Sequence, residues 1–253
     1  MNHTVLGIFA HPDDAEIVCA GTLSLLKKAG WEIHIATMTP GDKGSAELTR
    51  EEISKIRTGE AANSAALLDG TYHCLGFDDA YILYDRETIN QTTALIRKVR
   101  PDLVITASPN DYMVDHEMTA KIVQTACFCA GIKNMDAGGD TFGHVPHLYY
   151  ADPLEVKDIF GKFIEPSMYV DVTNEMDLKA AMLACHKSQR EWLLAHHKID
   201  EYILAMKRLG EDRGREVNVK YAEGFRQHLG HGYPQNNILK EHLAEKVIIK
   251  KYI

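Results

Sequence analysis

The amino-acid sequence predicts an α/β protein with a Rossmann-like, doubly wound and mostly parallel sheet flanked by helices, with extra C-terminal strands and helices. Two observations lead to this prediction. In the first half, short apolar and β-branched runs alternate with longer amphipathic stretches, which is typical of βαβ units. The chain has 253 residues, 45% hydrophobic and 25% charged, enough for one sizeable core. We therefore expect a single domain over residues 1–253, with a Rossmann-like core over about 1–130 and a C-terminal elaboration over about 131–253.

The first two strand–helix units follow one another directly. Val5–Ala10 predicts a buried strand that leads into a helix over Ile17–Ala29, which Gly30 closes. Glu32–Thr37 predicts the second strand, and the loop MTPGDKGS connects it to a helix over Arg50–Leu68. A helix between two strands is the usual crossover between parallel neighbours, so both strands should run in the same direction.

Two further units repeat this pattern. Thr71–Leu75 precedes a helix over Glu87–Val99, and Leu103–Thr106 precedes a helix from about Asp115 to Cys129. Successive units of this kind indicate a doubly wound sheet whose ligand lies at the carboxyl ends of the strands. The motif HPDD falls at one such end, directly after the first strand.

The second half is less regular. Residues 133–147 are rich in Gly, Asp and His and predict a loop, while 147–153 and 167–173 predict two further strands. Asp177–Leu209 is consistent with one long helix or a broken pair of helices. Residues 213–234 have a mixed pattern that supports no assignment.

Composition narrows the class of protein. The formal net charge of −8 and the lack of a Lys/Arg-rich stripe argue against a nucleic-acid partner. The five cysteines are scattered and odd in number, which predicts reduced core residues and a cytoplasmic location. The apolar run Val5–Ala10 is too short for a signal peptide, and no stretch is long enough to insert into a membrane.

The motif HPDD and a later histidine suggest a metal site. His11 and Asp14 lie three residues apart at a strand-to-helix turn, and His116 opens the helix after the fourth strand. If the first and fourth strands flank the point where strand order reverses, these three side chains converge. Two imidazoles and one carboxylate, with one position left for water, are typical of catalytic zinc.

Two neighbouring aspartates have expected roles beside these ligands. Asp13 would lie within reach of a water on the metal and could accept its proton as a general base. Asp115 could be a helix N-cap, or an acceptor that fixes the tautomer of a ligating imidazole. The alternative for HPDD is an ordinary turn with Asp13 or Asp14 as N-cap.

Several motifs together resemble a known family. AHPDDAE followed by GT, then TPGDKGS, LG and DD within 75–79, and PNDYMVDH are similar to the PIG-L/LmbE-like metal-dependent deacetylases, from about Val5 to Val123. The resemblance implies a Rossmann-like fold, zinc held by His11, Asp14 and His116, and Asp13 as the base. It also implies substrates that are N-acetylated sugars of the N-acetylglucosamine type.

The resemblance extends to two candidate substrate contacts. Arg57 and Asp79 match positions that the family gives to an arginine on the helix after the second strand and to a loop aspartate. The simpler alternatives are a solvated Arg57 paired with Glu51 or Glu60, and an Asp79 that only ends a strand in a turn.

One position departs from the family pattern. Many members carry a histidine three residues before the last ligand, proposed to protonate the leaving amine, and here that position is Met113. Either Asp13 serves as both base and acid, or another residue donates the proton. The spare histidines in loops are His144, His147, His228 and His231; His186, His196 and His197 lie on a predicted helix and are expected to be packed or surface residues.

The combined prediction is a metal-dependent hydrolase that removes an acetyl group from an N-acetylated sugar by attack of a zinc-bound water. We expect one Zn²⁺ per chain, although another divalent ion would also fit, and a small-molecule glycoconjugate as partner, with homo-oligomers left open. The alternative is a catalytically weak or inert family member that binds a ligand. A nucleotide-binding protein is disfavoured because the first turn lacks G-x-G-x-x-G and the acidic HPDD would repel a pyrophosphate.

Overall fold

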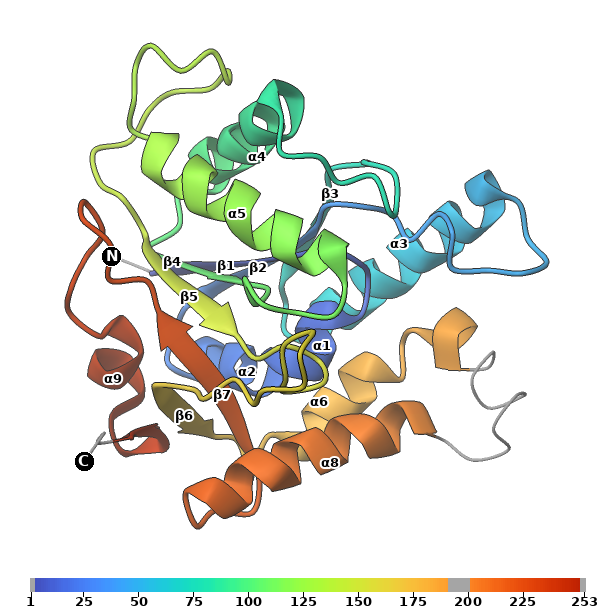
Figure 1. Ribbon diagram of the computed structural model, residues 1–253, viewed down its shortest axis with the longest axis vertical. Coiled ribbons are helices and arrows are strands. Elements are labelled where there is room, and N and C mark those ends of the chain that lie inside the picture. The colour runs from blue at the N-terminus through green and yellow to red at the C-terminus, as the bar shows by residue number, and fades with distance from the viewer. Residues whose placement is uncertain (1–2, 191–200, 251–253) are drawn as a thin grey trace.

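The computed structural model describes residues 3–190 and 201–250 and contains one eight-stranded sheet (Figure 1). The order of strands across the sheet is β3-β2-β1-β4-β5-β7-β6-β8. The strands are β1 (Thr4–Phe9), β2 (Glu32–Thr37), β3 (Thr71–Cys74), β4 (Leu103–Thr106), β5 (His147–Ala151), β6 (Met168–Asp171), β7 (Ala222–Gln227) and β8 (Val247–Ile249).

Strand order reverses between β1 and β4. β1 pairs in parallel with β2 on one side and with β4 on the other, and β3 and β5 extend the parallel part outward. The connections that follow β1 and β4 therefore leave the same edge of the sheet side by side, which is where doubly wound proteins bind ligands. Beyond β5 the sheet is antiparallel, because β7 runs against both β5 and β6, and β8 runs against β6.

Helices cover both faces of the sheet (Figure 1). Two of them, α4 (Arg86–Val99) and α5 (Val114–Cys129), pack on one face. The helices that pack on the opposite face are α1 (Asp14–Val18), α2 (Ala20–Lys28), α3 (Arg50–Ala66), α6 (Met176–Leu183), α8 (Glu201–Glu216) and α9 (Ile238–Leu243), which a short 3₁₀ helix η1 (Ala244–Lys246) follows. The predicted doubly wound α/β class is confirmed.

Alternation along β1 divides the core into two layers. Leu6 and Ile8 face α4 and α5, whereas Val5 and Phe9 face α1 and α2, and all four side chains are almost fully buried. Burial of such a side chain contributes about 1.5–3 kcal/mol. A central strand buried on both faces is thus a rigid support for whatever follows its last residue.

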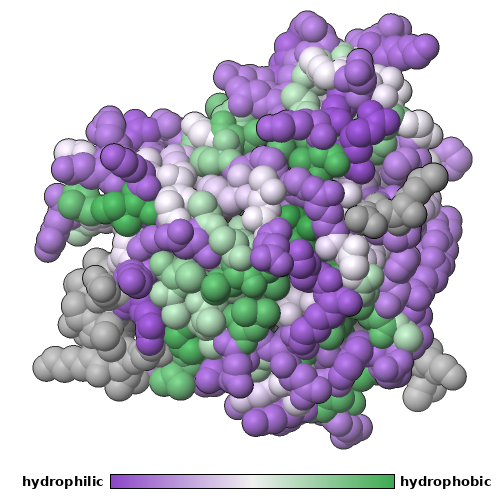
Figure 2. Space-filling view, turned by 180° about the vertical axis from the view of Figure 1, so that it is seen from behind, coloured by the Kyte–Doolittle hydropathy of each residue, from purple (hydrophilic) through white to green (hydrophobic). Residues whose placement is uncertain are grey.

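The back of the molecule is mostly hydrophilic, with separate apolar patches (Figure 2).

The prediction of one helix over Ile17–Ala29 is wrong in one respect, because the structure has two helices, α1 and α2, in this region. The backbone breaks at Cys19, whose φ of −145° and ψ of 3° are not helical. The break exposes the N–H groups at the start of α2, and Gly21 and Thr22 donate them to the Glu223 carboxylate at 2.9 and 2.7 Å. A partner more than 200 residues away in the chain therefore fixes this break.

The second half contains elements that the sequence left unassigned. β7 lies within 213–234, where no assignment was made, and β8 lies near the end of the described chain. Asp177–Leu209 does not form one continuous helix, because α6 ends at Leu183 and α8 begins only at Glu201. The alternative of a single long helix is therefore wrong. Residues 191–200, with His196 and His197, lie outside the described residues. Among the described helices, none is long and apolar enough to cross a membrane.

Candidate metal centre and cleft

His11, Asp14 and His116 come together at the carboxyl ends of β1 and β4. One donor atom of each lies within 4.8 Å of the other two. Asp14 Oδ2 is 3.6 Å from His11 Nδ1 and 3.4 Å from His116 Nε2, and it accepts the His11 backbone N–H at 2.9 Å. The structure thus places the three predicted ligands around one point.

In each imidazole, the nitrogen that is not near Asp14 lies close to another carboxylate. His116 Nδ1 lies 3.1 Å from Asp111 Oδ2, and His11 Nε2 lies 3.3 Å from Asp115 Oδ2. His116 Nε2 is buried without a hydrogen-bond partner among the described residues. When the rings are deprotonated, carboxylates in these positions fix the tautomers so that His11 Nδ1 and His116 Nε2 can present lone pairs to a cation beside Asp14. The donor set and its spacing therefore fit a divalent cation.

Asp115 is not an N-cap. α5 begins at Val114 and Met113 is its cap residue, so Asp115 lies inside the first turn. Its carboxylate instead reaches His11, and it also accepts the Ala80 backbone N–H at 2.6 Å. The N-cap alternative is wrong because the helix starts one residue earlier than predicted.

Strong electrostatic coupling links the three ligands. Burial favours neutral Asp14, but the two imidazoles outweigh it and hold the pKa of Asp14 well below its usual range. Burial likewise disfavours charged imidazoles, yet the surrounding carboxylates raise the pKa of His11 to about 9 and that of His116 to about 10. Protons therefore compete with a cation for these nitrogens, and metal affinity should fall as the pH falls.

Asp13 has an unusual backbone conformation. It precedes α1 with φ 104° and ψ −24°, and its side chain makes no capping hydrogen bond. Its Oδ2 instead accepts a hydrogen bond from Tyr202 Oη at 2.5 Å and lies 3.5 Å from Arg57 Nη2. Burial raises the pKa of Asp13, whereas the Arg57 guanidinium opposes the rise. The ordinary N-cap alternative is therefore wrong for Asp13, and Asp14 is already the first residue of the helix.

Arg57 is buried at the base of the cleft rather than solvated. Its Nη2 donates to the Pro12 carbonyl at 2.8 Å. A Cβ at Gly41 would lie 2.6 Å from the guanidinium, and one at Gly44 would lie 2.3 Å from it. The glycines of TPGDKGS thus let this loop cross over Arg57, and the alternative of a solvated arginine paired with a surface glutamate is wrong.

Asp79 lies in a turn after β3 and also faces the cleft. It is only 7% exposed, and its Oδ2 accepts the Lys43 backbone N–H at 3.0 Å. Its own backbone N–H donates to Asp42 Oδ1 at 2.7 Å. Asp79 Oδ1 is buried without a hydrogen-bond partner among the described residues.

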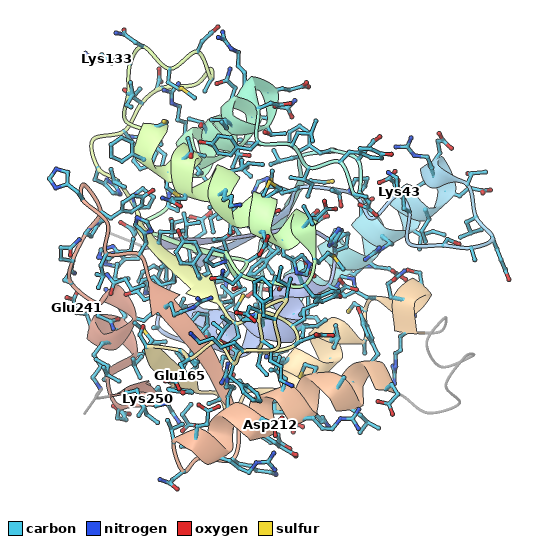
Figure 3. All side chains as sticks on the ribbon, viewed as in Figure 1. Lys43, Lys133, Glu165, Asp212, Glu241 and Lys250 are labelled. Atoms are coloured by element: carbon cyan, nitrogen blue, oxygen red, sulfur yellow. The ribbon has the colours of Figure 1, made fainter. Side chains whose placement is uncertain are left out.

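These side chains line one cleft of about 800 Å³, part of which is open to solvent. Lys43, labelled in Figure 3, comes from the loop between β2 and α3 at its rim. From the second half of the chain come Leu154, Gln189 and Tyr202, and the remaining lining residues are His11, Asp13, Asp14, Ile17, Gly44, Arg57, Asp79, Tyr112, Met113 and His116. The volume suits a small-molecule ligand.

Met113 lines this cleft at the position of the family histidine, and its backbone N–H donates to Asp111 Oδ1 at 3.0 Å. None of the spare loop histidines lines the cleft, so none of them replaces the family histidine. These residues are His144, His147, His228 and His231. His147, for example, starts β5 opposite Leu103 and so lies at the other end of the strands.

His186 is packed, as predicted. It is fully buried, and its Nε2 lies 3.3 Å from Glu16 Oε1. Burial lowers its pKa, but Glu16 and Asp13 outweigh this and raise it.

Two functional residues were missed from the sequence. Asp111 could have been found, because it is an acid five positions before His116 in PNDYMVDH. Tyr202 carried no such signal, since it lies 189 positions from Asp13 on an amphipathic helix.

Comparisons with known proteins identify a matching family model and several similar chains. Residues 6–127 match the family model described as PIG-L: GlcNAc-PI de-N-acetylase. This segment is therefore similar to a PIG-L domain. It runs from β1 into the last turn of α5 and includes the three candidate ligands and Asp13, but not Tyr202.

The relatives that this chain resembles have more than one activity. A diacetylchitobiose deacetylase from Thermococcus kodakarensis is 29% identical over 191 residues, covering 73% of this chain and 69% of the relative. A 4-oxalmesaconate hydratase from Pseudomonas putida is 23% identical over 232 residues, covering 88% of each. The solved N,N′-diacetylchitobiose deacetylase from Pyrococcus horikoshii superposes with a TM-score of 0.76 at 26% identity, covering 92% of this chain and 87% of that one.

Proposed function

We propose that this protein is a zinc-dependent deacetylase that removes the acetyl group from an N-acetylated sugar of the N-acetylglucosamine type. The observation that carries the proposal is the convergence of His11, Asp14 and His116 beside Asp13, within the segment that matches the PIG-L family model. The similarity to diacetylchitobiose deacetylases supports the substrate class.

The proposed ligands would hold one Zn²⁺ through His11 Nδ1, an Asp14 carboxylate oxygen and His116 Nε2. Two imidazoles and one carboxylate suit the borderline softness of this ion. Zinc in such a site polarises the acyl carbonyl and lowers the pKa of a bound water to about 7. Asp111 and Asp115 would keep both imidazoles in the required tautomer.

Asp13 is proposed to act as base and then as acid. Because Tyr202 and Arg57 both engage Oδ2, Oδ1 is the oxygen that takes a proton from the attacking water as the new C–O bond forms. When the C–N bond breaks, the same carboxyl group returns that proton to the leaving nitrogen. The products are acetate and a free amine. Met113 has no proton to donate, which is why the proposal assigns both transfers to Asp13.

Polar groups in the cleft support a sugar as the substrate. Asp79 lines the cleft, and its Oδ1 has no hydrogen-bond partner among the described residues. A sugar hydroxyl that reaches this carboxylate would therefore find an acceptor without a competing donor.

A smaller pocket beside the ligands supports acetyl as the acyl group. This pocket has room for about one group of the size of a water molecule, and it shares Asp14, His116 and Leu154 with the main cleft. Its walls combine apolar side chains with polar ones, namely Phe9, Val18 and Ala107 with Ser108, Asp111 and Asp152. A methyl group held there would lie next to the metal ligands, whereas a long acyl chain would have to displace these walls.

A hydratase is the second candidate function. The Pseudomonas putida 4-oxalmesaconate hydratase aligns with more of this chain than the Thermococcus deacetylase does. Addition of water to a carbon–carbon double bond releases no amine, so it does not need the family histidine that Met113 replaces. The same base, Asp13, could activate water for either reaction.

One experiment separates the two candidates. The zinc-loaded protein is incubated with N,N′-diacetylchitobiose and N-acetylglucosamine, and acetate release is measured beside consumption of 4-oxalmesaconate. We expect acetate release that Asp13→Asn slows by about 10²–10⁴-fold. Consumption of the unsaturated acid without acetate release from either sugar would overturn the deacetylase proposal in favour of the hydratase.

A further inference from the structure

The backbone of Asp13 needs a specific restraint. A φ of 104° is unfavourable for any residue with a Cβ, and such conformations persist only where surrounding contacts enforce them. The local sequence offers an easier alternative, since an aspartate before a helix normally turns its carboxylate to the free N–H groups of the first turn. Asp13 makes no such hydrogen bond. Something outside the turn therefore holds the side chain away from α1.

Two contacts on Oδ2 provide this restraint. Arg57 Nη2 is 3.5 Å away and is already committed to the Pro12 carbonyl at 2.8 Å, so it acts on Asp13 mainly through charge. Tyr202 Oη donates a hydrogen bond at 2.5 Å, which is the shorter and more directional of the two. A hydrogen bond to a carboxylate is stronger than one between neutral groups, and burial strengthens it further.

Tyr202 reaches the site from a separate part of the chain. It lies near the start of α8, outside the residues 6–127 that match the PIG-L family, and it is only 9% exposed. The ring packs in the core between the sheet and α8, so the hydroxyl has little freedom to move away. The hydroxyl and Asp13 both line the cleft.

We infer that Tyr202 is a positioning residue for Asp13. By holding Oδ2 it keeps the carboxylate away from the helix N-terminus and presents Oδ1 to the point where His11, Asp14 and His116 converge. The inference rests on the proposed function, in which Oδ1 receives the proton. It assigns to the C-terminal elaboration a direct part in orienting the base.

Tyr221 provides a matched control for Tyr202. Tyr221 is also 9% exposed, and its hydroxyl also donates to an acid, Glu211 Oε1, at 3.4 Å. It does not line the cleft. Tyr202→Phe and Tyr221→Phe therefore remove the same hydroxyl from two similarly buried tyrosines, of which only one touches Asp13.

The kinetic test compares these two variants with the wild type on N,N′-diacetylchitobiose. For Tyr202→Phe we expect kcat to fall about tenfold, KM to change less than about twofold and the zinc content to stay the same. Tyr221→Phe should leave all three within about twofold of the wild type. In an Asp13→Asn background, Tyr202→Phe should cause little further loss, because its effect passes through Asp13. Equal kcat values for Tyr202→Phe and the wild type, or a full tenfold loss in that background, would overturn the inference.

A crystal structure of Tyr202→Phe tests the inference without any substrate. We expect Asp13 to leave its positive φ, or its carboxylate to rotate onto the N–H groups of α1. An unchanged backbone and carboxylate would overturn the positioning role. If the wild type hydrolyses no N-acetylated sugar, the proposed function fails, and this structure still decides whether Tyr202 holds Asp13.

Discussion

The two halves of the sheet differ in how they are built and in what they supply. From β1 to α5 the strands are parallel, each is followed by helical structure, and the candidate ligands lie within this region. Beyond β5 the added strands pair antiparallel, and this later part of the chain brings Leu154, Gln189 and Tyr202 to the cleft. The first region thus holds the chemistry, whereas the second covers and orients it.

The two regions are also joined in an unusual way, through buried polar contacts. Glu223 on β7 accepts N–H groups from the start of α2 and pairs with Lys179 at 2.5 Å. Glu175 accepts hydrogen bonds from Ser24 and Lys28 of α2. Unlike apolar packing, hydrogen-bonded contacts tolerate little sliding, because a shift would leave buried charges unpaired. This comparison predicts that changes in the first region abolish chemistry and changes at the junction reduce stability.

The largest expected effect is loss of the metal centre. His116→Ala should lose the bound zinc and essentially all activity, because one of three ligands is missing. The fold should remain, since the two core layers do not depend on this side chain. Metal analysis and circular dichroism on the purified variant check both points. Full zinc content in His116→Ala would show that the ligand set is wrong.

Removal of the base should have the next largest effect. Asp13→Asn keeps the shape of the side chain but cannot take up a proton, so kcat should fall by about 10²–10⁴-fold while zinc is retained. Asp14→Asn is the control and should lose zinc instead. The opposite pattern, with zinc lost from Asp13→Asn and kept by Asp14→Asn, would require the two roles to be exchanged.

A change at the junction should affect stability rather than chemistry. Glu223→Gln leaves Lys179 buried without its counter-charge and should lower the free energy of unfolding by about 3–5 kcal/mol. The more exposed pair between Lys246 and Asp171 is the comparison, and Lys246→Met should cost about 0–1 kcal/mol. Urea denaturation measures both. Similar losses in the two variants would mean that the junction is not held by this buried pair.

The smallest effect is expected at Met113, where the chain departs from the pattern of the PIG-L family. If Asp13 returns the proton to the amine, Met113→His should change hydrolysis of an amide by less than about twofold, although a missing general acid would be worth about 10²–10⁴-fold. Amide and ester hydrolysis are compared in the wild type and the variant. A large gain on the amide alone would contradict the role of Asp13 as both base and acid.

The sequence predicted the first region well because its determinants are local. β2 and β4 were predicted over the observed residues, and β1 and β3 to within a residue at each end, since apolar runs bounded by turns mark buried strands. Parallel strands place their carboxyl ends at one edge, so His11 and His116 could be brought together without knowing any long-range contact.

The second region resisted prediction because its determinants are distant. β7 contains Glu223 and Gly224, which are unusual in a strand. Glu223 is there because it meets Lys179 and the start of α2, and a Cβ on Gly224 would lie 2.2 Å from Asp152 Oδ2. Neither reason can be read from neighbouring residues. The contact between Tyr202 and Asp13 was missed for the same reason.

The position of the candidate ligands along the chain has an evolutionary consequence. Because His11, Asp14 and His116 all lie on the contiguous segment that forms β1 to α5, later segments can be replaced, lengthened or repacked without removing a ligand. Selection could therefore exchange the walls of the cleft and the support of the base while a metal centre is inherited intact. Such a division of labour lets one scaffold give rise to enzymes of different reaction types, as the deacetylase and hydratase names of its relatives illustrate.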